Sequence, residues 1–435
     1  MIDAPCGAGK TEYIIRYLNE HRERPFLYIS PLRKMFERIE GKGEYKGRGI
    51  EGRTIFTPEI DRYNRTKLHS LKEQISVGVD VMSTHALFLR LDDEATDMFG
   101  QYDYGLIIDE ALDAVTALPT GKGRVNDEED FVFHDLKQRV TDGNLKWLLE
   151  HDCISIDSSN YNRVVWTDKS HNLEHRYEDI ERMVKAGGIS YVNGTFLIWS
   201  FPISVLEAFR DVTILTYRFD SSIFKAYLDF YGKDYEHKTV VREGNDLHLA
   251  NFTQMISQGK QYANLMNICT AEKLNAIGLK TGRKCPLSYG WYSRSDKVQR
   301  KALKNNLTNY FRHYCKADSD SVMWTTYKGH SDSIKPPGYI VRRDGKTPSF
   351  VPCNSKATEQ FKERYNLAYL IDRYLNPGIE AFFLQKNITV PEDEYALSEF
   401  IQWIFRSRIR KGEPISLYVP SERMRNLLLA WLGLQ

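Results

Sequence analysis

The sequence has few cysteines and no long apolar run, and each absence excludes a class of protein. Its six cysteines are scattered, with no CxxC pair, which argues against a structural zinc site and for a reducing compartment. No apolar run approaches the ~18 residues that a membrane span needs, and no signal peptide is evident. We therefore expect a cytoplasmic protein with no membrane partner.

An overall excess of one charge is also nearly absent, since 60 Lys and Arg face 58 Asp and Glu. The charge is uneven along the chain, however, because residues 270–350 hold 16 Lys or Arg against 6 Asp or Glu. A local surplus of this size favours a polyanion partner such as nucleic acid. The alternative is a solvated lysine-rich helix over residues 297–311 that binds nothing.

The length of 435 residues predicts two or three domains at the usual ~100 to 200 residues each. Residues 1–112 alternate short apolar runs with helical stretches, as a doubly wound parallel sheet requires. The expected strands are 26–30, 79–84 and 104–109, and each ends in polar residues. Ligands of such sheets bind at the carboxyl ends of the strands.

Residues 4–11, APCGAGKT, fit the loose pattern of a phosphate-binding loop. The next stretch, TEYIIRYLNEH, has helical apolar spacing, so Lys10 and Thr11 would open a helix whose N-terminus attracts phosphate. Lys10 would neutralise the β- and γ-phosphates, and the Thr11 hydroxyl would bind Mg²⁺. The backbone N–H groups that would cradle the β-phosphate belong to Gly7, Ala8, Gly9, Lys10 and Thr11.

Two adjacent carboxylates follow an apolar run roughly 100 residues after this loop. Asp109 would hold the metal, and Glu110 would be the general base that orients and activates the attacking water. The alternative is a helix N-cap followed by an acidic residue in the first turn. The phosphate loop earlier in the same chain favours the catalytic interpretation.

APCGAGKT together with LIIDEAL resembles motifs I and II of superfamily 2 helicases of the DEAD/DEAH-box kind. YISPLRK (28–34) resembles their motif Ia, and VMSTHALF (81–88) resembles the nucleic-acid-binding motif that follows it. The resemblance implies ATP as the nucleotide. It also implies contacts to the sugar-phosphate backbone of a nucleic acid from Arg33, Ser83, Thr84 and His85. For His85, a satisfied core or capping histidine is the alternative.

Two features depart from the pattern of that family. ILTYRFDSS (214–222) resembles motif III, which links hydrolysis to strand movement, but Tyr217 stands where a small residue is usual. Only three residues precede Ala4, so any adenine-reading element is expected elsewhere in the chain.

Residues 223–435 can supply the second RecA-like lobe that such a motor needs. The segments 322–328, 349–354 and 414–420 are typical of buried strands, and Ser421 would cap a last helix. Residues 352–377 are similar to the motif V region of phage-encoded members of the superfamily. The residues that would meet the nucleic-acid backbone or the γ-phosphate are Asn354, Ser355, Lys356 and Thr358.

The segment ALSEFIQWIFRSRIRKG (396–412) offers arginine fingers that would stabilise the transferring phosphoryl group. In a helix, Gln402, Arg406 and Arg410 lie four apart and share one face, whereas Arg408 points about 200° away from Arg406. This spacing selects Arg406 and Arg410. The segment also resembles motif VI, in which a Gln precedes two arginines, so Gln402 would bind the nucleotide. A basic helix face in solvent is the alternative.

The basic segment also carries aromatic side chains that can stack on the bases of a single strand. Most aromatic residues lie in cores, so we expect only one or two of them to touch bases. They are Tyr289, Trp291, Tyr292, Tyr310, Phe311 and Tyr314.

The expected fold class is α/β, with two RecA-like parallel-sheet lobes at 1–222 and 223–435 and an insertion at about 113–205 in the first lobe. The favoured function is a nucleic-acid-dependent ATPase and helicase that translocates on and unwinds DNA, single-stranded or forked, rather than RNA. It would act in phage replication or recombination, alongside proteins of those processes, in the cytoplasm of a bacterial host. Two alternatives stay open: an ATP-dependent clamp or remodelling switch without unwinding, and a small-molecule phosphotransferase.

Overall fold

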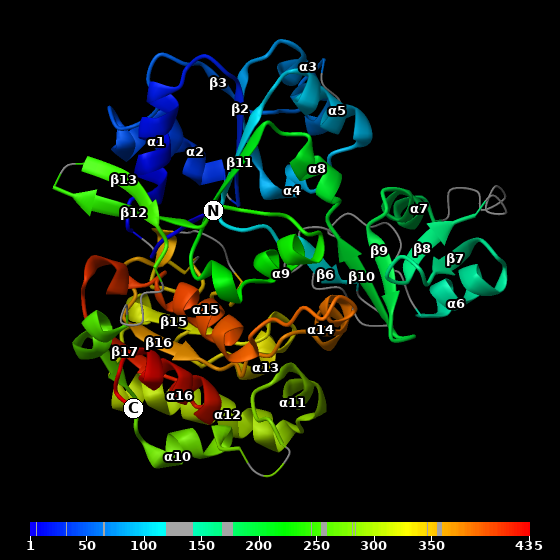
Figure 1. Ribbon diagram of the computed structural model, residues 1–435. Coiled ribbons are helices and arrows are strands. Elements are labelled where there is room, and N and C mark those ends of the chain that lie inside the picture. Colours follow the sequence, from blue (N-terminus) through cyan, green and yellow to red (C-terminus); the bar gives the residue numbers. More distant parts are fainter. Residues whose placement is uncertain are drawn as a thin grey trace. The chain divides into compact units, whose positions relative to one another are not determined.

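The chain forms two compact units (Figure 1). The first comprises Met1–Phe252 and Asn376–Val390, and the second comprises Thr253–Leu375 and Pro391–Gln435. The computed structural model describes residues 1–5, 7–31, 33–63, 66–118, 142–167, 177–244, 246–253, 259–280, 282, 284–345, 347–354 and 359–435. In the described parts of the chain, no helix is both long enough and apolar enough to span a membrane.

An eight-stranded sheet organises the first unit, in the order β13-β12-β1-β11-β5-β2-β4-β3. All neighbours are parallel except the pair β12 and β13. The strands are β1 (Ile2–Asp3), β2 (Phe26–Ser30), β3 (Ile55–Phe56), β4 (Asp80–Thr84), β5 (Gly105–Asp109), β11 (Asp211–Thr216), β12 (Lys238–Glu243) and β13 (Asp246–Asn251). The three strands predicted from the sequence are β2, β4 and β5.

The predicted strands were recognisable because they are buried on both faces, as parallel sheets between helices are. Every residue of β2 and β5 is buried. We expected the first lobe to end at residue 222, but the first unit continues to Phe252. It does so because β12 pairs with β1, and β13 pairs with β12. That pairing joins segments more than 200 residues apart, which local sequence patterns do not report.

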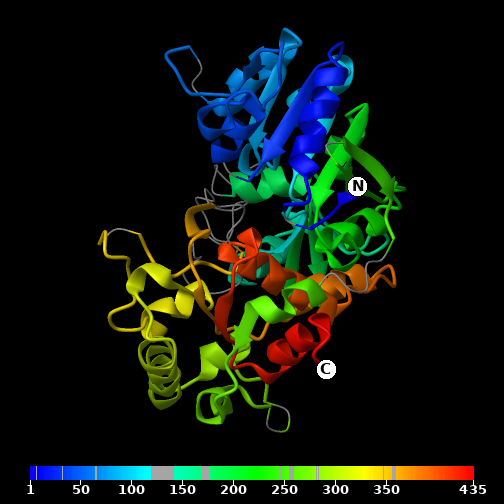
Figure 2. The ribbon, with the colours of Figure 1, turned by 90° about the vertical axis from the view of Figure 1, so that its left-hand side faces the viewer.

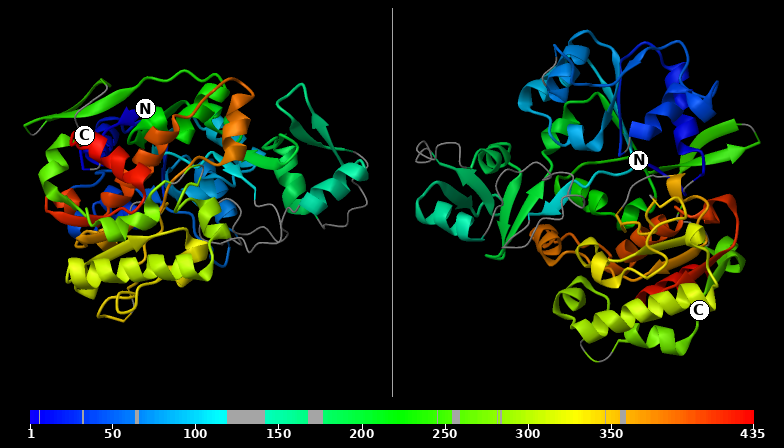
Figure 3. Two further views of the ribbon diagram at one scale, coloured as in Figure 1. Left: turned by 90° about the horizontal axis from the view of Figure 1, so that it is seen from below. Right: turned by 180° about the vertical axis from the view of Figure 1, so that it is seen from behind.

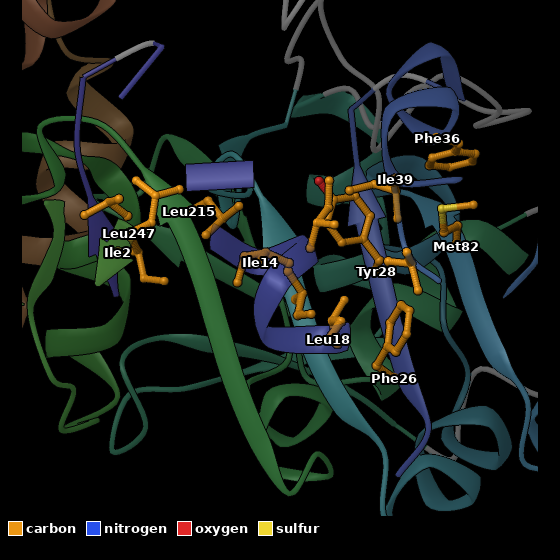
Figure 4. Packing of buried hydrophobic residues seen from close by; sticks show 14 residues of the cluster. Ile2, Ile14, Leu18, Phe26, Tyr28, Phe36, Ile39, Met82, Leu215 and Leu247 are labelled. Atoms are coloured by element: carbon orange, nitrogen blue, oxygen red, sulfur yellow. The ribbon is translucent and has the colours of Figure 1, made fainter. Parts of the chain in front are cut away.

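Helix α1 (Lys10–Glu20) packs its apolar stripe on this sheet, and Figures 1 and 2 show it in dark blue beside the strands. Ile14 and Leu18 lie four residues apart on the buried face. Figure 4 shows both between Leu215 on one side and Tyr28 on the other. The first unit also holds helices α2 (Phe36–Glu40), α3 (Lys67–Ser76), α4 (His85–Phe88), α5 (Asp93–Gln101), α8 (Ile203–Glu207) and α9 (Ile223–Phe230).

A second sheet lies within the range in which the sequence predicted an insertion. Its five strands are antiparallel, in the order β6-β10-β9-β8-β7. They are β6 (Val115–Ala117), β7 (Ile154–Asp157), β8 (Arg163–Trp166), β9 (Ile189–Val192) and β10 (Phe196–Ser200), with helices α6 (Asp142–Glu150) and α7 (Glu178–Lys185).

A segment from late in the chain completes the first unit. Helix α14 (Pro377–Leu384) packs beside the second sheet, as the orange helix in both views of Figure 3 shows. Phe382 stacks on Phe230 of α9 with ring centroids 4.4 Å apart. Lys386 donates a hydrogen bond to the Phe230 carbonyl, and Gln385 accepts one of 3.1 Å from Asn162. The chain therefore leaves the second unit after Leu375 and returns at Pro391.

Gly378→Ala is expected to lower the free energy of unfolding by about 1 to 3 kcal/mol, because a Cβ there overpacks the contact. The added Cβ would stand 2.8 Å from Cγ of Phe196. The matched control is Gly100→Ala in α5, where the nearest atom is a carbonyl oxygen 3.4 Å away. Urea unfolding should show a lower midpoint for the first variant and an unchanged or higher midpoint for the second. Equal midpoints would contradict the close packing of α14.

The second unit holds a four-stranded parallel sheet in the order β14-β17-β16-β15. Its strands are β14 (Met266–Ile268), β15 (Val322–Thr325), β16 (Asn366–Tyr369) and β17 (Ile415–Tyr418). Its helices are α10 (Glu272–Asn275), α11 (Tyr289–Arg294), α12 (Lys297–Asn309), α13 (Ser331–Ile334), α15 (Glu392–Ile404) and α16 (Glu422–Trp431). The fold class predicted from the sequence, α/β with two parallel-sheet lobes and an insertion in the first, is confirmed.

Two of the three strands predicted for this unit exist, β15 and β17. The third, over 349–354, is wrong, because this segment makes only an isolated bridge between Phe350 and Trp324. Ser421 caps α16 as predicted, since its side chain accepts a hydrogen bond of 3.2 Å from the Met424 N–H. The lysine-rich stretch is helix α12, with a capping box between Asp296 and Gln299.

Candidate functional site

The carboxyl ends of the parallel strands bring the candidate residues of the first unit to one edge of the sheet. Asp3 ends β1, Asp109 ends β5 and Thr216 ends β11. In the order of the described strands, β11 lies between β1 and β5. The loop that follows β1 and the acidic pair that ends β5 therefore lie close together, although a hundred residues of sequence separate them.

The predicted phosphate loop follows β1 directly, and α1 begins at Lys10 as expected. Gly7 and Gly9 have φ of +86° and +99°, which residues with a Cβ rarely adopt, so glycine is required at both. The Ala4 N–H donates to the Thr216 carbonyl at 3.2 Å, which ties the loop to the end of β11. The Ala8 N–H donates to the Pro5 carbonyl at 3.2 Å. This backbone leaves room for a phosphate to approach closely.

The Lys10 ammonium folds back over its own loop. It donates to the Ala4 carbonyl and, at 3.2 Å, to the Pro5 carbonyl. Carbonyl oxygens are neutral acceptors, and a phosphate is a charged one that binds an ammonium more strongly. The side chain is thus held at the loop by partners that an anion can replace.

The two carboxylates at the end of β5 sit in different surroundings. Asp109 is 7% exposed, and its Oδ2 accepts a hydrogen bond of 2.8 Å from the buried Tyr28 hydroxyl. Burial raises the pKa of the Asp109 carboxyl, while the Tyr28 hydrogen bond and the charges of Lys10 and Arg38 lower it. A divalent cation beside Asp109 would stabilise the charged form further.

Glu110 has a backbone φ of +65°, in the left-handed region. A non-glycine residue held there is strained by about 1 to 3 kcal/mol, and such residues cluster at functional sites. Glu110 follows the last residue of β5 directly, and it is half-buried. This arrangement suits an acid that acts on a ligand at the sheet edge.

The donor set fits Mg²⁺ and a nucleoside triphosphate. Thr11 supplies a hydroxyl in the first turn of α1 and is 8% exposed, and Asp109 supplies a carboxylate. Oxygen donors of this kind are those that Mg²⁺ prefers. In the described residues no group of three or more His, Cys, Asp or Glu side chains could hold a metal by itself. A metal here would therefore share its coordination with the phosphates and water.

Asp3 is a site residue that the sequence reasoning missed. It is 2% exposed, and its two carboxylate oxygens accept hydrogen bonds of 2.8 Å from the N–H groups of Arg218 and Phe219. His237 approaches the same carboxylate at 3.3 Å. Asp3 thus anchors the turn after Thr216 to the strand that precedes the phosphate loop. The only signal in the sequence was a lone acid at the end of a very short apolar run.

Three of the residues expected to contact nucleic acid lie at the end of β4 and the start of α4. The Ser83 side chain is buried, and Thr84 caps α4 by accepting from the Leu87 N–H at 3.3 Å. His85 is 6% exposed, and its Nε2 lies 2.9 Å from the Asp109 carbonyl oxygen. His85 is thus a core histidine, the alternative that the sequence left open, and it braces the acidic pair.

The remaining residues expected at nucleic acid lie on the surface or outside the described parts. Arg33 is on the surface and pairs with Glu59 at 2.7 Å. Asn354 is half-buried in the second unit, and Ser355, Lys356 and Thr358 lie outside the described residues.

Half of the six aromatic residues in the basic segment are core residues, whereas most were expected to be. Tyr292, Tyr310 and Phe311 are fully buried. Tyr289 and Tyr314 are 64% and 43% exposed, and Trp291 is half-buried. Only the exposed pair is available to stack on bases without a change in the fold.

The arginines do not lie on one helical face as predicted, because α15 ends at Ile404. Ser407 interrupts the helix with an extended backbone, and a short 3-10 helix follows at Arg408–Lys411. Ile409 of this turn is completely buried. Gln402 therefore does not share a face with Arg410.

Each of the three arginines has a different environment in the second unit. Arg406 is 9% exposed and donates to the Cys353 carbonyl at 3.3 Å. Arg408 lies over the Tyr365 ring, 4.0 Å from its centroid. Arg410 is exposed to solvent. Gln402, the predicted nucleotide contact, donates to the Ser398 hydroxyl at 3.2 Å.

Both units have relatives among known families. Residues 260–432 match the model of the YonV C-terminal Rossmann-like domain, and residues 136–199 match that of the YonV middle domain. The chain is 32% identical over 442 residues to the SPbeta prophage-derived uncharacterized protein YonV of Bacillus subtilis (strain 168). That match covers 99% of this chain and 98% of the relative. The chain belongs to the YonV family.

The YonV family models follow the architecture described above. The middle-domain range holds β7, β8, β9 and most of β10, but not β6. The Rossmann-like range covers the second unit from residue 260 and also includes Asn376–Val390 of the first unit. The prophage origin of the relative confirms the expected link to phage-encoded proteins. Membership of the DEAD/DEAH-box kind stays a prediction.

Two solved structures are also similar to this member of the YonV family. An XPD helicase has 12% identity and a TM-score of 0.48, with 100% of this chain and 95% of that chain covered. XPD in its apo form has 12% identity and a TM-score of 0.47, with 98% and 94% covered. At these TM-scores the likeness carries no conclusion about activity.

Proposed function

We propose that this chain is a nucleic-acid-dependent ATPase that uses Mg²⁺-ATP to translocate on DNA and to unwind it during phage replication or recombination. The observation that carries the proposal is the position of the phosphate loop and the acidic pair. They follow β1 and β5 at the same edge of one parallel sheet, with a single strand between them. Superfamily 2 helicases, which the sequence motifs resemble, hydrolyse ATP with the same two elements.

Different residues of the chain bind the phosphates, accept the proton of the attacking water and hold the metal. Backbone N–H groups from Gly7 to Thr11 bind the phosphates, and Lys10 moves from its loop carbonyls to the β- and γ-phosphate oxygens. Glu110 orients a water molecule and accepts its proton. Thr11 and Asp109 would hold Mg²⁺, which when bound neutralises charge on the phosphates.

The second unit supports a two-lobed motor. It has its own parallel sheet, a surplus of basic residues over 270–350, and one exposed arginine in the motif VI-like segment. Lys and Arg bind the phosphate backbone without reading its sequence, as a translocating enzyme requires. The exposed Tyr289 and Tyr314 supply stacking faces for single-stranded bases.

One observation favours a clamp that binds DNA without unwinding it. The segment that resembles motif III has Tyr217 in place of a small residue, and Asp3 holds the next two N–H groups in place. This departure from motif III weakens the expected link between hydrolysis and strand movement. Strand displacement therefore has to be measured beside ATP turnover.

Lys10→Ala is expected to lower ATP turnover in the presence of single-stranded DNA at least about a hundredfold, because a charged donor to the phosphates is lost. The assay measures ATPase rate with and without single-stranded DNA or RNA, together with displacement of a labelled strand. The control is Lys72→Ala, which removes a lysine of α3 that pairs with Asp92 at 2.7 Å and with Glu94. This control should keep its turnover.

The same assay separates the candidate functions. Stimulation by nucleic acid with strand displacement supports the motor, and stimulation without displacement supports the clamp. Turnover that ignores nucleic acid would overturn both in favour of a small-molecule phosphotransferase. Equal turnover of the wild type and Lys10→Ala would show that the loop is not the ATP site.

A further inference from the structure

The hairpin formed by β12 and β13 runs past the phosphate loop. β12 pairs in parallel with β1 at Ile2 and Lys238. β1 ends at Asp3, whereas β12 continues to Glu243. The second half of β12 therefore lies beside the loop that follows β1, and Figure 1 shows the green hairpin next to α1.

One face of this hairpin is apolar and packs around α1. Val240 and Leu247 belong to the core cluster of this helix, Leu249 packs against it, and Figure 4 shows Leu247 next to Ile2. Side chains alternate between the faces of a strand, so Arg242 shares the face of Val240 and stands directly opposite Leu247. The apolar face of the hairpin thus ends in the Arg242 guanidinium, beside the phosphate loop.

The Arg242 guanidinium reaches both the loop and the first turn of α1. Its Nη2 lies 2.5 Å from Oε2 of Glu12, and 3.3 Å from the point at which a Cβ on Gly9 would stand. The Arg242 and Glu12 side chains are 46% and 39% exposed. Solvent weakens an ion pair this exposed, so the guanidinium is able to exchange the carboxylate for a phosphate oxygen.

The order of the strands decides which end of a nucleotide meets the hairpin. In the order β12-β1-β11-β5, the hairpin lies on one side of β1 and the acidic pair Asp109 and Glu110 lies on the other. The γ-phosphate has to face the acidic pair for water to attack it. The α-phosphate and the nucleoside then extend toward the hairpin.

We propose that Arg242 binds the α-phosphate of the nucleoside triphosphate, and that the β12–β13 hairpin forms the nucleoside side of the site. This assignment rests on the proposed nucleotide hydrolysis. A planar guanidinium forms two parallel hydrogen bonds with phosphate oxygens, which an ammonium does not. Arg242 is therefore a nucleotide-binding residue outside the motifs that the sequence displayed.

Binding of two probes tests the proposal by calorimetry: Mg²⁺-ATP, and Mg²⁺-pyrophosphate, which carries no nucleoside or α-phosphate. Arg242→Ala is expected to weaken ATP binding about tenfold or more and to leave pyrophosphate binding unchanged. Arg242→Lys should lie between, because it keeps the charge and loses the fork. The matched control is Arg16→Ala, since Arg16 also pairs with Glu12, at 3.1 Å, and with Asp246 of the hairpin, at 3.8 Å.

The outcomes separate this inference from the proposed function. Wild-type binding of ATP that Arg242→Ala does not change overturns the inference alone. An equal loss for ATP and pyrophosphate, or an equal loss in Arg16→Ala, also overturns it, because the hairpin then only supports the loop. A wild-type chain without affinity for ATP overturns the proposed function and the inference with it. The midpoint of thermal unfolding checks that each variant is folded.

Discussion

Glu110→Gln is expected to lower DNA-stimulated ATP hydrolysis by about 10² to 10⁴ while leaving ATP binding nearly unchanged. Glutamine keeps the size of the side chain and its ability to orient water, but it cannot accept the proton. The backbone φ of +65° at Glu110 places this acid at the sheet edge in the left-handed region, and the substitution does not alter that requirement. Single-turnover hydrolysis and equilibrium binding of ATP, measured on the same preparation, separate the two effects.

The opposite end of β5 offers the matched control. Asp103 is an exposed acid with φ of +54°, two residues before the strand begins. Asp103→Asn changes the same chemical group in the same type of backbone, but far from the carboxyl edge. Its turnover should equal that of the wild type. If Glu110→Gln turns over normally, another group is the base, and if it loses ATP binding as well, Glu110 serves the structure of the site.

The elements that form the proposed nucleotide site were predictable because each leaves a local signal. Strands buried on both faces, such as β2 and β5, are continuous apolar runs. The glycines of the loop indicate a backbone conformation with positive φ, which residues with a Cβ avoid. Gly7 and Gly9 do have positive φ. The helix after the loop has the apolar spacing that buries Ile14 and Leu18.

The parts that were not predictable depend on partners far away in the sequence. Asp3 is an ordinary acid until its bonds to the N–H groups of Arg218 and Phe219 are known. The packing of α14 depends on Phe230, a residue about 150 positions earlier in the chain. His85 has the same local sequence whether it faces solvent or braces Asp109, and only the packing of β4 against β2 decides.

The end of α15 shows how tertiary packing overrides a helical pattern. FRSRIR contains no Gly or Pro, so the apolar and basic spacing alone favours a helix that continues to Arg410. Ser407 instead donates to the Ile404 carbonyl at 2.7 Å, and Ile409 turns into the core. The helical face therefore gives no reason to prefer Arg410, but exposure does.

Arg410→Ala is expected to lower ATP turnover about 10³-fold or more and to change ATP binding little, because an arginine finger stabilises the transferring phosphoryl group rather than the bound nucleotide. Arg410 is exposed, and in the described parts of the chain its side chain has no ion pair to give up. Arg406 is a weaker candidate, because it is buried and bonds to the Cys353 carbonyl. The measurement is the maximal DNA-stimulated ATPase rate beside the dissociation constant of ATP.

Arg408→Ala is the control variant for Arg410→Ala. Arg408 already stacks on Tyr365 and donates from Nε to the Pro414 carbonyl at 2.6 Å, so its loss should lower the midpoint of thermal unfolding and leave turnover intact. Equal losses of turnover from Arg408→Ala and Arg410→Ala would mean that the segment matters only as a folded whole. Loss of turnover from Arg408→Ala alone would place the finger on Arg408, which is less exposed than Arg410 and already has partners.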